Sequence, residues 1–351
     1  MRIAITGASG NAGTALLRNL QGQLSRKPGS LQLTGISRRR PDTSRAPYAG
    51  VEWHALDVGL ESDRPLLESA LAGVDCVVHL AWQIQPNRDL DQLYRTNVTG
   101  TANVLEAARM AGTKHFVCAS SIGAYSKAPK DGRTDESWPA EGMAGSHYSR
   151  HKAAQEKLLD EFAAAEPGIG VARLRPGLIF QRDAGSEIGR YFLGPVIPRL
   201  LPKRPWVPLL PAPDNLIFQA VHADDVADAY WRVIDQRASG AFNIAAEPVL
   251  TPQELARIVR ARRILPIPMG LLHKLVGFAW QLRLLPTDSG WVEMAAGVPV
   301  MDTGRARRIL GWEAKSSSVE AVLDVLAGVG TGEGVAPSPV LKPRQATPPI
   351  G

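Results

Sequence analysis

The sequence predicts an α/β fold: a doubly wound parallel sheet accompanied by a smaller, discontinuous domain. Two patterns predict it. Short runs rich in β-branched residues alternate with segments of helical length, and a glycine-rich turn joins the first run to the first helix. Helices that alternate with parallel strands cover both faces of the sheet through right-handed crossovers. We therefore expect a Rossmann-type sheet in the first half of the chain.

The individual elements follow from this alternation. The expected strands cover residues 2–6, 31–37, 51–56, 74–80, 113–119 and 170–175. The expected helices of this half cover residues 11–21, 63–72, 90–111 and 145–165.

The pattern changes after residue 176, so we place the first domain at 1–176 and a second region at 177–327. Within the second region, a strand at 216–221, a helix at 223–237 and a strand at 241–244 make 216–244 a return to the main sheet. Prolines break up 194–214, which we interpret as a loop region. Small and polar residues dominate 328–351, which predicts a disordered tail.

Composition excludes several classes of protein. With 44% hydrophobic and 21% charged residues, the chain matches folded globular proteins. The net charge of +6 attracts phosphorylated ligands, acidic lipids or nucleic acid alike, but no basic stripe interleaved with aromatic residues is present, so we predict no nucleic-acid binding. We also predict no metal site. Cys76 and Cys118 lie in apolar strand-like runs and are expected as free, buried thiols.

The N-terminal residues and the most apolar stretch of the chain indicate where the protein is located. The chain enters a strand at its second residue, without the apolar region of a signal peptide, which predicts a cytoplasmic protein. Residues 264–285 contain prolines and basic side chains, so we predict no integral membrane segment. Contact of 264–285 with a membrane surface is left open.

A glycine motif follows the first strand and opens the first helix, the context in which such a motif predicts dinucleotide binding. Gly7 permits the tight turn, Gly10 lets the backbone approach a pyrophosphate, and Gly13 lets the helix pack on the strand. The predicted cofactor contacts of this motif are Gly7, Ser9, Gly10, Asn11, Ala12 and Gly13.

Arginines stand at the end of the second strand, where an acidic residue often contacts the ribose hydroxyls of NAD. A guanidinium binds a 2′-phosphate through two hydrogen bonds, so Arg38, and after it Arg39, favours NADP(H), with NAD(H) as the other candidate. A solvated basic loop is the alternative interpretation.

Two further groups are expected at the carboxyl edge of the sheet, because they follow the third and fourth strands. Asp57 and Val58 are predicted to contact the adenosine half of the cofactor, although Asp57 fits the role of a turn cap equally well. Leu80, Ala81 and Trp82 follow the fourth strand and are predicted to line the same edge.

The candidate catalytic residues are Tyr148 and Lys152, which lie four residues apart and therefore on one face of a helix. We expect the Lys152 ammonium to lower the pKa of the Tyr148 phenol, so that Tyr148 passes a proton to or from a substrate oxygen. Ser120 and Ser121, on the preceding loop, can hydrogen-bond that oxygen. Asn97, on a buried helix face, is predicted to order groups beside the site or to be purely structural.

Motifs in a fixed order make the chain resemble the extended short-chain dehydrogenase/reductase family, the NAD-dependent epimerase/dehydratase group, over residues 1–327. These are the glycine motif, Asn97-Val98-Thr99-Gly100-Thr101, Ser120-Ser121 before Tyr125, Tyr148 through Lys152, Leu174-Arg175-Pro176, Val221-His222-Ala223-Asp224-Asp225-Val226, Ala241-Phe242-Asn243-Ile244 and Leu310-Gly311-Trp312.

The resemblance implies specific roles. It implies that Ser121 is the active-site hydroxyl, Tyr148 the acid/base and Lys152 the lysine that also holds the nicotinamide ribose. It further implies cofactor contacts at Ala119, Ser120, Asn97 and the strand end Pro176, Gly177 and Ile179. Residues 1–176 are then the dinucleotide-binding domain and 177–327 the substrate-binding region. A homodimer through the helices of 90–111 and 145–165 is expected by the same resemblance.

Departures from the family pattern bear on the reaction. Ile122-Gly123 replaces the Asp-Glu pair that sugar-nucleotide dehydratases carry, which disfavours dehydration. Asn11 stands where the family often has an aromatic residue. Phe180-Gln181 replaces the usual Tyr-Gly, and this second change weakens the case for a sugar-nucleotide substrate.

Three functions remain, each with a small-molecule ligand. The first is hydride transfer between NADP(H) and a carbonyl or hydroxyl substrate. The second is a nucleotide-sugar 4-epimerase that retains its NAD(P), and the third is a dinucleotide-sensing protein without turnover. The complete Tyr148, Lys152 and Ser121 set argues against the third.

Overall fold

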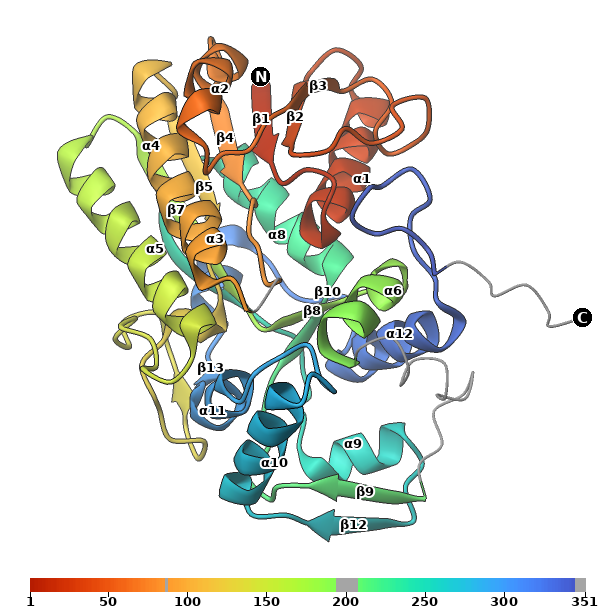
Figure 1. The fold of residues 1–351 in the computed structure, drawn as a ribbon. Helices are drawn as coiled ribbons and strands as arrows, with labels where there is room; N and C mark the ends of the chain where they lie inside the picture. The colour runs from red at the N-terminus through yellow and green to blue at the C-terminus, as the bar shows by residue number, and fades with distance from the viewer. Residues whose placement is uncertain (86–87, 194–207, 345–351) are drawn as a thin grey trace, which may run out of the picture.

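A seven-stranded parallel sheet organises the part of the chain that the computed structural model describes, namely residues 1–85, 88–193 and 208–344 (Figure 1). Every neighbouring pair of its strands is parallel. In spatial order the strands are β11 (Gly240–Ile244), β7 (Gly170–Pro176), β5 (His115–Ala119), β4 (Cys76–His79), β1 (Arg2–Thr6), β2 (Gln32–Ser37) and β3 (Glu52–Ala55). The reversal of strand order beside β1 is the doubly wound arrangement predicted from the sequence.

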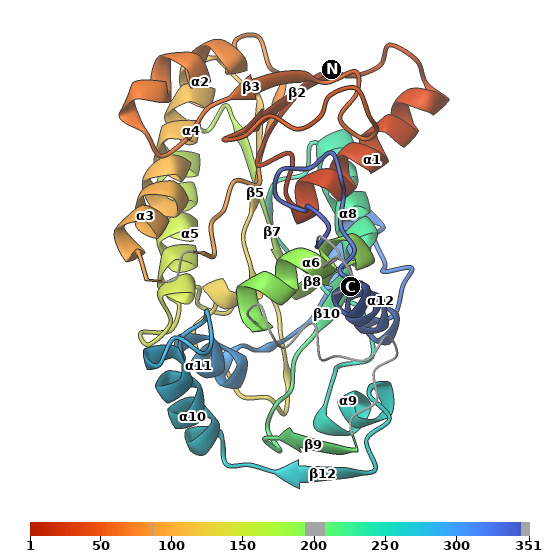
Figure 2. The ribbon, with the colours of Figure 1, turned by 45° about the vertical axis from the view of Figure 1, so that its right-hand side comes forward.

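Helices cover both faces of this sheet (Figures 1 and 2). One face carries α1 (Asn11–Arg26) and α8 (Ala223–Gln236), which pack on each other. The other face carries α2 (Arg64–Leu71), α4 (Gly100–Met110) and α5 (His147–Ala165). A separate apolar core fills each interface, because buried residues alternate between the two faces of the strands.

The predicted helix at 90–111 forms as three consecutive pieces. They are α3 (Leu90–Tyr94), the π-helical turn η2 (Arg95–Thr99) and α4. A π-turn inserts one extra residue per turn and is frequent at functional sites. Here it holds Asn97, which is fully buried at the carboxyl edge of the sheet.

Three short parallel strand pairs lie apart from the main sheet. They are β8 (Leu178–Phe180) with β10 (Ala220–His222), β9 (Leu209–Ala212) with β12 (Arg263–Pro266), and β6 (Arg133–Thr134) with β13 (Val300–Met301). The predicted return of 216–244 to the main sheet is therefore only half right. Strand β11 joins the sheet beside β7, but β10 pairs with β8 outside it. Gly177, which lies between β7 and β8, has no room for a Cβ because Gln219 O is too close.

The structure describes further helices and short turns besides those on the two sheet faces. They are α6 (Gly185–Ile188), η5 (Gly189–Leu193), α9 (Pro252–Ile258), α10 (Met269–Gln281), α11 (Gly290–Gly297) and α12 (Ser318–Thr331), with the short turns η1 (Glu61–Asp63), η3 (Ile122–Ala124), η4 (Arg182–Ala184) and η6 (Ala306–Leu310). Strands β9 and β12 with α9 and α10 form the end of the molecule remote from β1 (Figure 2). Most of the proline-rich loop predicted at 194–214 lies outside the described residues.

The prediction of a disordered tail from residue 328 is wrong as far as residue 344. Helix α12 continues to Thr331, and the segment after it buries Val335, Ser338 and Leu341 against the body of the protein. The composition of this segment suggested that nothing would offset the entropy lost on ordering it. Two buried apolar side chains and a turn closed by the Ser338 hydroxyl do so. Residues 345–351 lie outside the described part.

Three smaller features complete the description of the fold. Cys76 and Cys118 are buried and free, as predicted. The imidazole of His222 caps α8 by accepting a hydrogen bond from Asp224 N, and the Asp225 carboxylate accepts from Lys315 N and Ser316 N. Both side chains therefore order local structure. Along the described ranges, no helix has the length and apolar composition to cross a membrane.

Candidate active site

The glycine motif forms a turn that only small residues can occupy. Gly7 adopts φ +69°, and its amide donates to Ile36 O at 2.8 Å, which ties the turn to β2. A Cβ on Gly13 would stand 2.5 Å from Gly7 O, so a larger residue at position 13 would push α1 off the turn. Helix α1 begins at Asn11 behind the cap residue Gly10, and its first amides have no partner within the helix. A helix terminus with free amides of this kind can bind an anion.

Two of the departures from the family pattern contact each other. Gln181 Nε2 donates to Asn11 Oδ1 at 2.5 Å, and Asn11 Nδ2 donates to Ile179 O at 3.3 Å. Arg18 of α1 donates to Gln181 Oε1 at 3.2 Å. The glycine turn and the strand end at Ile179 are thereby joined by an amide pair, and Asn11 and Gln181 are best understood as one linked change.

The predicted basic contacts lie on the surface. Arg38 and Arg39 are exposed, and Ser37 Oγ donates to Arg39 O at 2.9 Å, which turns the chain away from the end of β2. Both guanidinium groups can therefore meet a ligand at that strand end, and the structure keeps both the cofactor and the solvated-loop interpretations.

The adenosine-side group takes part in a turn. Asp57 Oδ1 accepts from Gly59 N at 2.9 Å, which is the capping role given as the alternative to an adenine contact. Val58 is buried, and its backbone oxygen accepts from Asn103 Nδ2 at 2.8 Å. The end of β3 is thus fixed against α4.

The loop after β4 brings Trp82 into the site. Ala81 N donates to Thr6 Oγ1 at 3.3 Å, and Leu80 is buried. Asn97 clamps the next residue of this loop, because its Oδ1 accepts from Gln83 N at 2.7 Å and its Nδ2 donates to Gln83 O at 2.8 Å. Both polar atoms of the Asn97 side chain bind the backbone of Gln83. Asn97 therefore positions the loop that carries Trp82.

Tyr148 lies between two tryptophans. Helix α5 begins at His147, capped by Ser146, which puts Tyr148 in the first turn. Its ring centroid is 5.7 Å from that of Trp82 and 4.9 Å from that of Trp291 on α11. Burial raises the pKa of the Tyr148 phenol to about 12, and a hydrogen bond with Ser121 acts in the opposite direction. The phenol is therefore protonated at neutral pH.

Lys152 points past Tyr148 to other groups. Its Nζ donates to Ala119 O at 2.6 Å and to Gln155 Oε1 at 3.0 Å, and it lies 3.4 Å from the centroid of the Trp82 ring. Burial lowers the pKa of Lys152 to about 7. The expected lowering of the Tyr148 pKa by Lys152 is wrong for this structure, because burial raises that pKa and the Lys152 ammonium binds Ala119 O and Gln155 instead.

The two serines of the loop after β5 diverge. Ser121 Oγ accepts from Gly123 N at 3.0 Å and faces Tyr148. The Ser120 hydroxyl instead donates to the buried Glu156 carboxylate. Ser121 is therefore the hydroxyl beside Tyr148, whereas Ser120 binds Glu156 and helps to hold α5 in place.

Sequence reasoning missed Glu156. Its carboxylate is buried and contacts Arg173 at 2.8 Å and Arg175 at 2.9 Å, and these guanidinium groups hold its pKa at about 2 against the effect of burial. Glu156 follows Lys152 by four residues, so it lies on the same helix face, and Arg175 lies within the Leu-Arg-Pro motif. A buried carboxylate at that spacing was the available signal.

The remaining predicted contacts lie at the end of β7. Gly177 N donates to Ile244 O at 2.9 Å, and Pro176 and Gly177 lead directly into β8 with Ile179. A Cβ on Gly177 would meet Gln219 O at 2.5 Å. The backbone at Gly177 therefore lies close to that of Gln219, and β8 then leads to Gln181, which binds Asn11.

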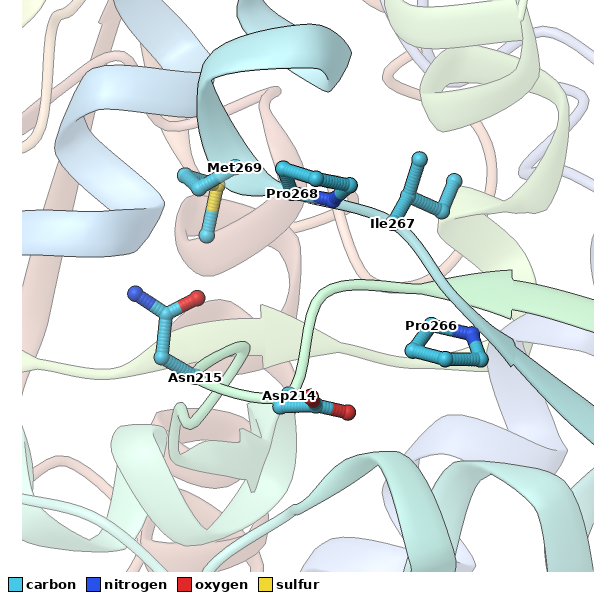
Figure 3. Close-up of a pocket in the computed structure, with 6 residues that line it drawn as sticks. All are labelled: Asp214, Asn215, Pro266, Ile267, Pro268 and Met269. Carbon is cyan, nitrogen blue, oxygen red and sulfur yellow. The ribbon is translucent and has the colours of Figure 1, made fainter.

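A separate surface hollow lies away from these residues. Figure 3 shows its lining side chains, which come from the turn after β9 and from the connection between β12 and α10. They are Asp214, Asn215, Pro266, Ile267, Pro268 and Met269. None of them is a predicted site residue, so the Tyr148 region remains the candidate active site.

The order of the parallel strands and the glycine turn after β1 place the chain in the Rossmann fold class. Residues 3–245 match the model of the NAD dependent epimerase/dehydratase family, and the chain belongs to that family of enzymes.

Three relatives illustrate the similarity. An uncharacterized protein of Mycobacterium tuberculosis is 29% identical over 342 residues, 95% of this chain, which spans only 31% of that relative's length. An L-arabinose 1-dehydrogenase (NAD(P)(+)) of Haloferax volcanii is 30% identical over 196 residues, 53% of this chain and 70% of the relative. A UDP-glucose 4-epimerase of Thermus thermophilus, solved with NAD, has a TM-score of 0.66 at 20% identity over 94% of this chain and 99% of its own.

Proposed function

We propose that the protein transfers a hydride between NADP(H) and a carbonyl or hydroxyl substrate, with Tyr148 as the acid/base. The observation that carries this proposal is the protonated Tyr148 phenol, whose pKa burial raises to about 12, next to the Ser121 hydroxyl. A neutral phenol is a proton donor, which a carbonyl needs as it becomes an alcohol.

The residues at the sheet edge fit a dinucleotide. The cradle at Gly7 and Gly13 leaves no room for a Cβ, and the first-turn amides of α1 suit a pyrophosphate. On this proposal Asn11 and Ala12 hold the pyrophosphate, Asp57 and Val58 meet the adenosine half, and Lys152 meets the nicotinamide ribose. Ala119 and the strand end at Pro176 and Ile179 line the nicotinamide side. The bound nucleotide supplies the hydride.

A preference for NADP(H) rests on charge. Arg38 and Arg39 are exposed beside the end of β2, free of the acidic residue that usually meets the ribose hydroxyls of NAD. By their printed descriptions, the solved 4-epimerase holds NAD and the L-arabinose 1-dehydrogenase uses NAD(P)(+), so the proposed preference rests on Arg38 and Arg39 alone.

The protein groups act in a fixed order. Ser121 and Tyr148 hydrogen-bond the substrate carbonyl oxygen and polarise it, and Tyr148 then gives its proton to the oxygen as negative charge develops there. Trp82 and Trp291 cover the phenol and exclude water. Lys152, held by Ala119 O and Gln155, fixes the ribose side of the reacting pair.

A second candidate is a nucleotide-sugar 4-epimerase, which would use the same residues in both directions with a retained nucleotide. The observation that favours it is the similarity to a solved UDP-glucose 4-epimerase along 94% of this chain. Phe180-Gln181 is against it, since Tyr-Gly is usual at these two positions, and Gln181 is here bound to Asn11.

One experiment separates the two functions. The purified protein is denatured to release any bound nucleotide, and fresh protein is then mixed with NADPH and a panel of aldehydes and ketones. The proposal expects an empty or partly loaded protein and net NADPH consumption equal to the alcohol formed. Stoichiometrically retained nucleotide, with inversion of a UDP-sugar and no net consumption, would instead establish the epimerase.

A homodimer through α4 and α5 belongs to the same proposal. Large apolar side chains remain exposed on this side of the chain, among them Tyr94 and Met110. Light scattering of the purified protein measures this directly, with a mass of two chains expected.

A further inference from the structure

Helix α10 is apolar on nearly every side, yet none of its residues is buried. Helices of this composition are normally found inside a core or against a membrane. Among its 13 residues only His273, Lys274 and Gln281 carry polar side chains apart from the indole of Trp280. The exposed surface of this helix therefore needs an explanation that the fold of the single chain does not give.

The exposed apolar residues form one stripe. Leu271, Leu275, Phe278 and Leu282 follow one another at helical spacing of three or four residues, with exposed fractions of 46%, 53%, 61% and 54%. Leu284, beyond the helix, is 68% exposed and extends the stripe. We call these five residues the α10 stripe. Contiguous exposed apolar surface of this kind marks an interaction site.

The opposite side of α10 is anchored to the protein. Arg88 stacks on the Trp280 ring at 4.2 Å and donates to Trp280 O, and Gly277 faces Ser289 ahead of α11. Helix α10 packs against α11, the helix that carries Trp291 to Tyr148. Figures 1 and 2 both draw α10 on the outside of the molecule beside α11. The α10 stripe is thus held outward on a fixed support.

The segment of sequence that carries the stripe has charges of one sign. Asp and Glu are absent from residues 255–287, whereas Lys and Arg occur six times in that segment. Lys274 and Arg283 are exposed and border the stripe itself. Apolar side chains bordered by basic ones complement an anionic lipid surface, because acyl chains take the apolar groups and phosphates take the cations.

We propose that the α10 stripe docks on the surface of a membrane that contains anionic phospholipid, with α10 lying in the plane of the interface. A helix of 13 residues is too short to span a bilayer, so the helix lies on the membrane. The basic border selects an anionic bilayer over a second copy of this chain, which presents the same positive charge.

The test is sedimentation of the full-length protein with vesicles. Wild-type protein is mixed with phosphatidylcholine vesicles and with vesicles that also contain phosphatidylglycerol. The bound fraction should be larger by about tenfold with the anionic vesicles, and should fall as salt is raised. Lys274→Glu combined with Arg283→Glu should remove the preference for anionic vesicles.

A matched pair of variants tests the stripe. Leu275→Glu with Phe278→Glu should lower vesicle binding by about tenfold or more, since each adds a charge that resists the apolar interface. The control is Ile309→Glu with Leu323→Glu, which puts the same two charges on exposed apolar positions of η6 and α12 and should leave binding unchanged. Thermal unfolding verifies that all variants are folded, and vesicles should slow hydrogen exchange at 269–284.

Three results would overturn the proposal. They are no binding of wild type to anionic vesicles, an equal loss of binding in the control pair, and a stable dimer in light scattering that only the Leu275 and Phe278 variant abolishes. The last would show that a second copy covers the stripe. None of these measurements uses turnover, so they are independent of the proposed reaction.

Discussion

The Ser338 hydroxyl donates a hydrogen bond to the backbone oxygen of Ser9 at 2.8 Å, so the C-terminal segment contacts the glycine motif across 329 positions of sequence. The neighbouring Pro337 O accepts from Asp42 N at 2.9 Å, in the loop that begins at the basic residues after β2. One segment therefore touches both loops to which we assign cofactor contacts.

Ser338→Ala should weaken NADPH binding by about fivefold, because a lost hydrogen bond of about 1 kcal/mol loosens the glycine turn. Titration calorimetry measures the affinity. Ser317→Ala is the control, since it removes the capping box of α12 and costs about 1 kcal/mol of stability at a site without contact to either loop. Equal affinities for both variants and wild type would contradict a role of the segment in binding.

Arg38→Ala with Arg39→Ala should lower the preference for NADPH over NADH by about tenfold or more, since a charged hydrogen bond to a phosphate contributes about 1.5–3 kcal/mol. The measurement is the ratio of the two dissociation constants. Arg26→Ala with Lys27→Ala, exposed at the far end of α1, removes the same charge and should leave the ratio unchanged. An unchanged ratio in the Arg38 and Arg39 variant would disprove the assignment.

Glu156→Gln should destabilise the protein by about 3–5 kcal/mol, because it leaves the buried Arg175 guanidinium without its carboxylate and leaves the buried Arg173 with only the exposed Asp160. Urea unfolding measures the loss. Glu161→Gln on the same helix breaks only an exposed pair with Lys157 at 3.8 Å and should cost less than about 1 kcal/mol. Similar losses in both variants would show that the buried network is not a special support of α5.

Lys152 gives stability a defined pH dependence. Its pKa is about 7 in the folded protein and about 10.4 in an unfolded chain, so between these values the unfolded state binds more protons. The free energy of unfolding should therefore rise with pH in that window, by up to about 1.4 kcal/mol per unit from this group. Urea unfolding from pH 7.5 to 9.5 should give a flatter profile for Lys152→Met, and identical slopes would refute the lowered pKa.

The fold was predictable from the sequence because both of its signals are local. Alternating strand and helix patterns fix the parallel sheet, and Gly7 and Gly13 fix the turn that opens α1. The pairing of β10 with β8 was not predictable, because it depends on a bend at Gly177 that no periodicity records. The order of the segment up to residue 344 was not predicted, because small and polar residues dominate its composition. Its order depends on two apolar side chains, Val335 and Leu341, that are buried against the rest of the protein.

The site was predictable in its members more than in its electrostatics. Spacing brings Tyr148 and Lys152 onto one helix face, and Ser121 lies beside Tyr148 as expected. The direction of the Tyr148 pKa depends on how Trp82 and Trp291 enclose the ring, and Trp291 comes from a helix some 140 residues later in the chain. Contacts between residues so distant leave no pattern in one sequence.

The most direct test of the proposed function follows deuterium. Wild-type protein and Tyr148→Phe are given NADPH deuterated at nicotinamide C4 with a carbonyl compound from the panel, and the product is analysed by mass spectrometry. The account predicts one deuterium on the carbinol carbon, formed more slowly by about 10²-fold or more in Tyr148→Phe at similar NADPH affinity. Deuterium that stays in a retained nucleotide, or a Tyr148→Phe variant as fast as wild type, would contradict it.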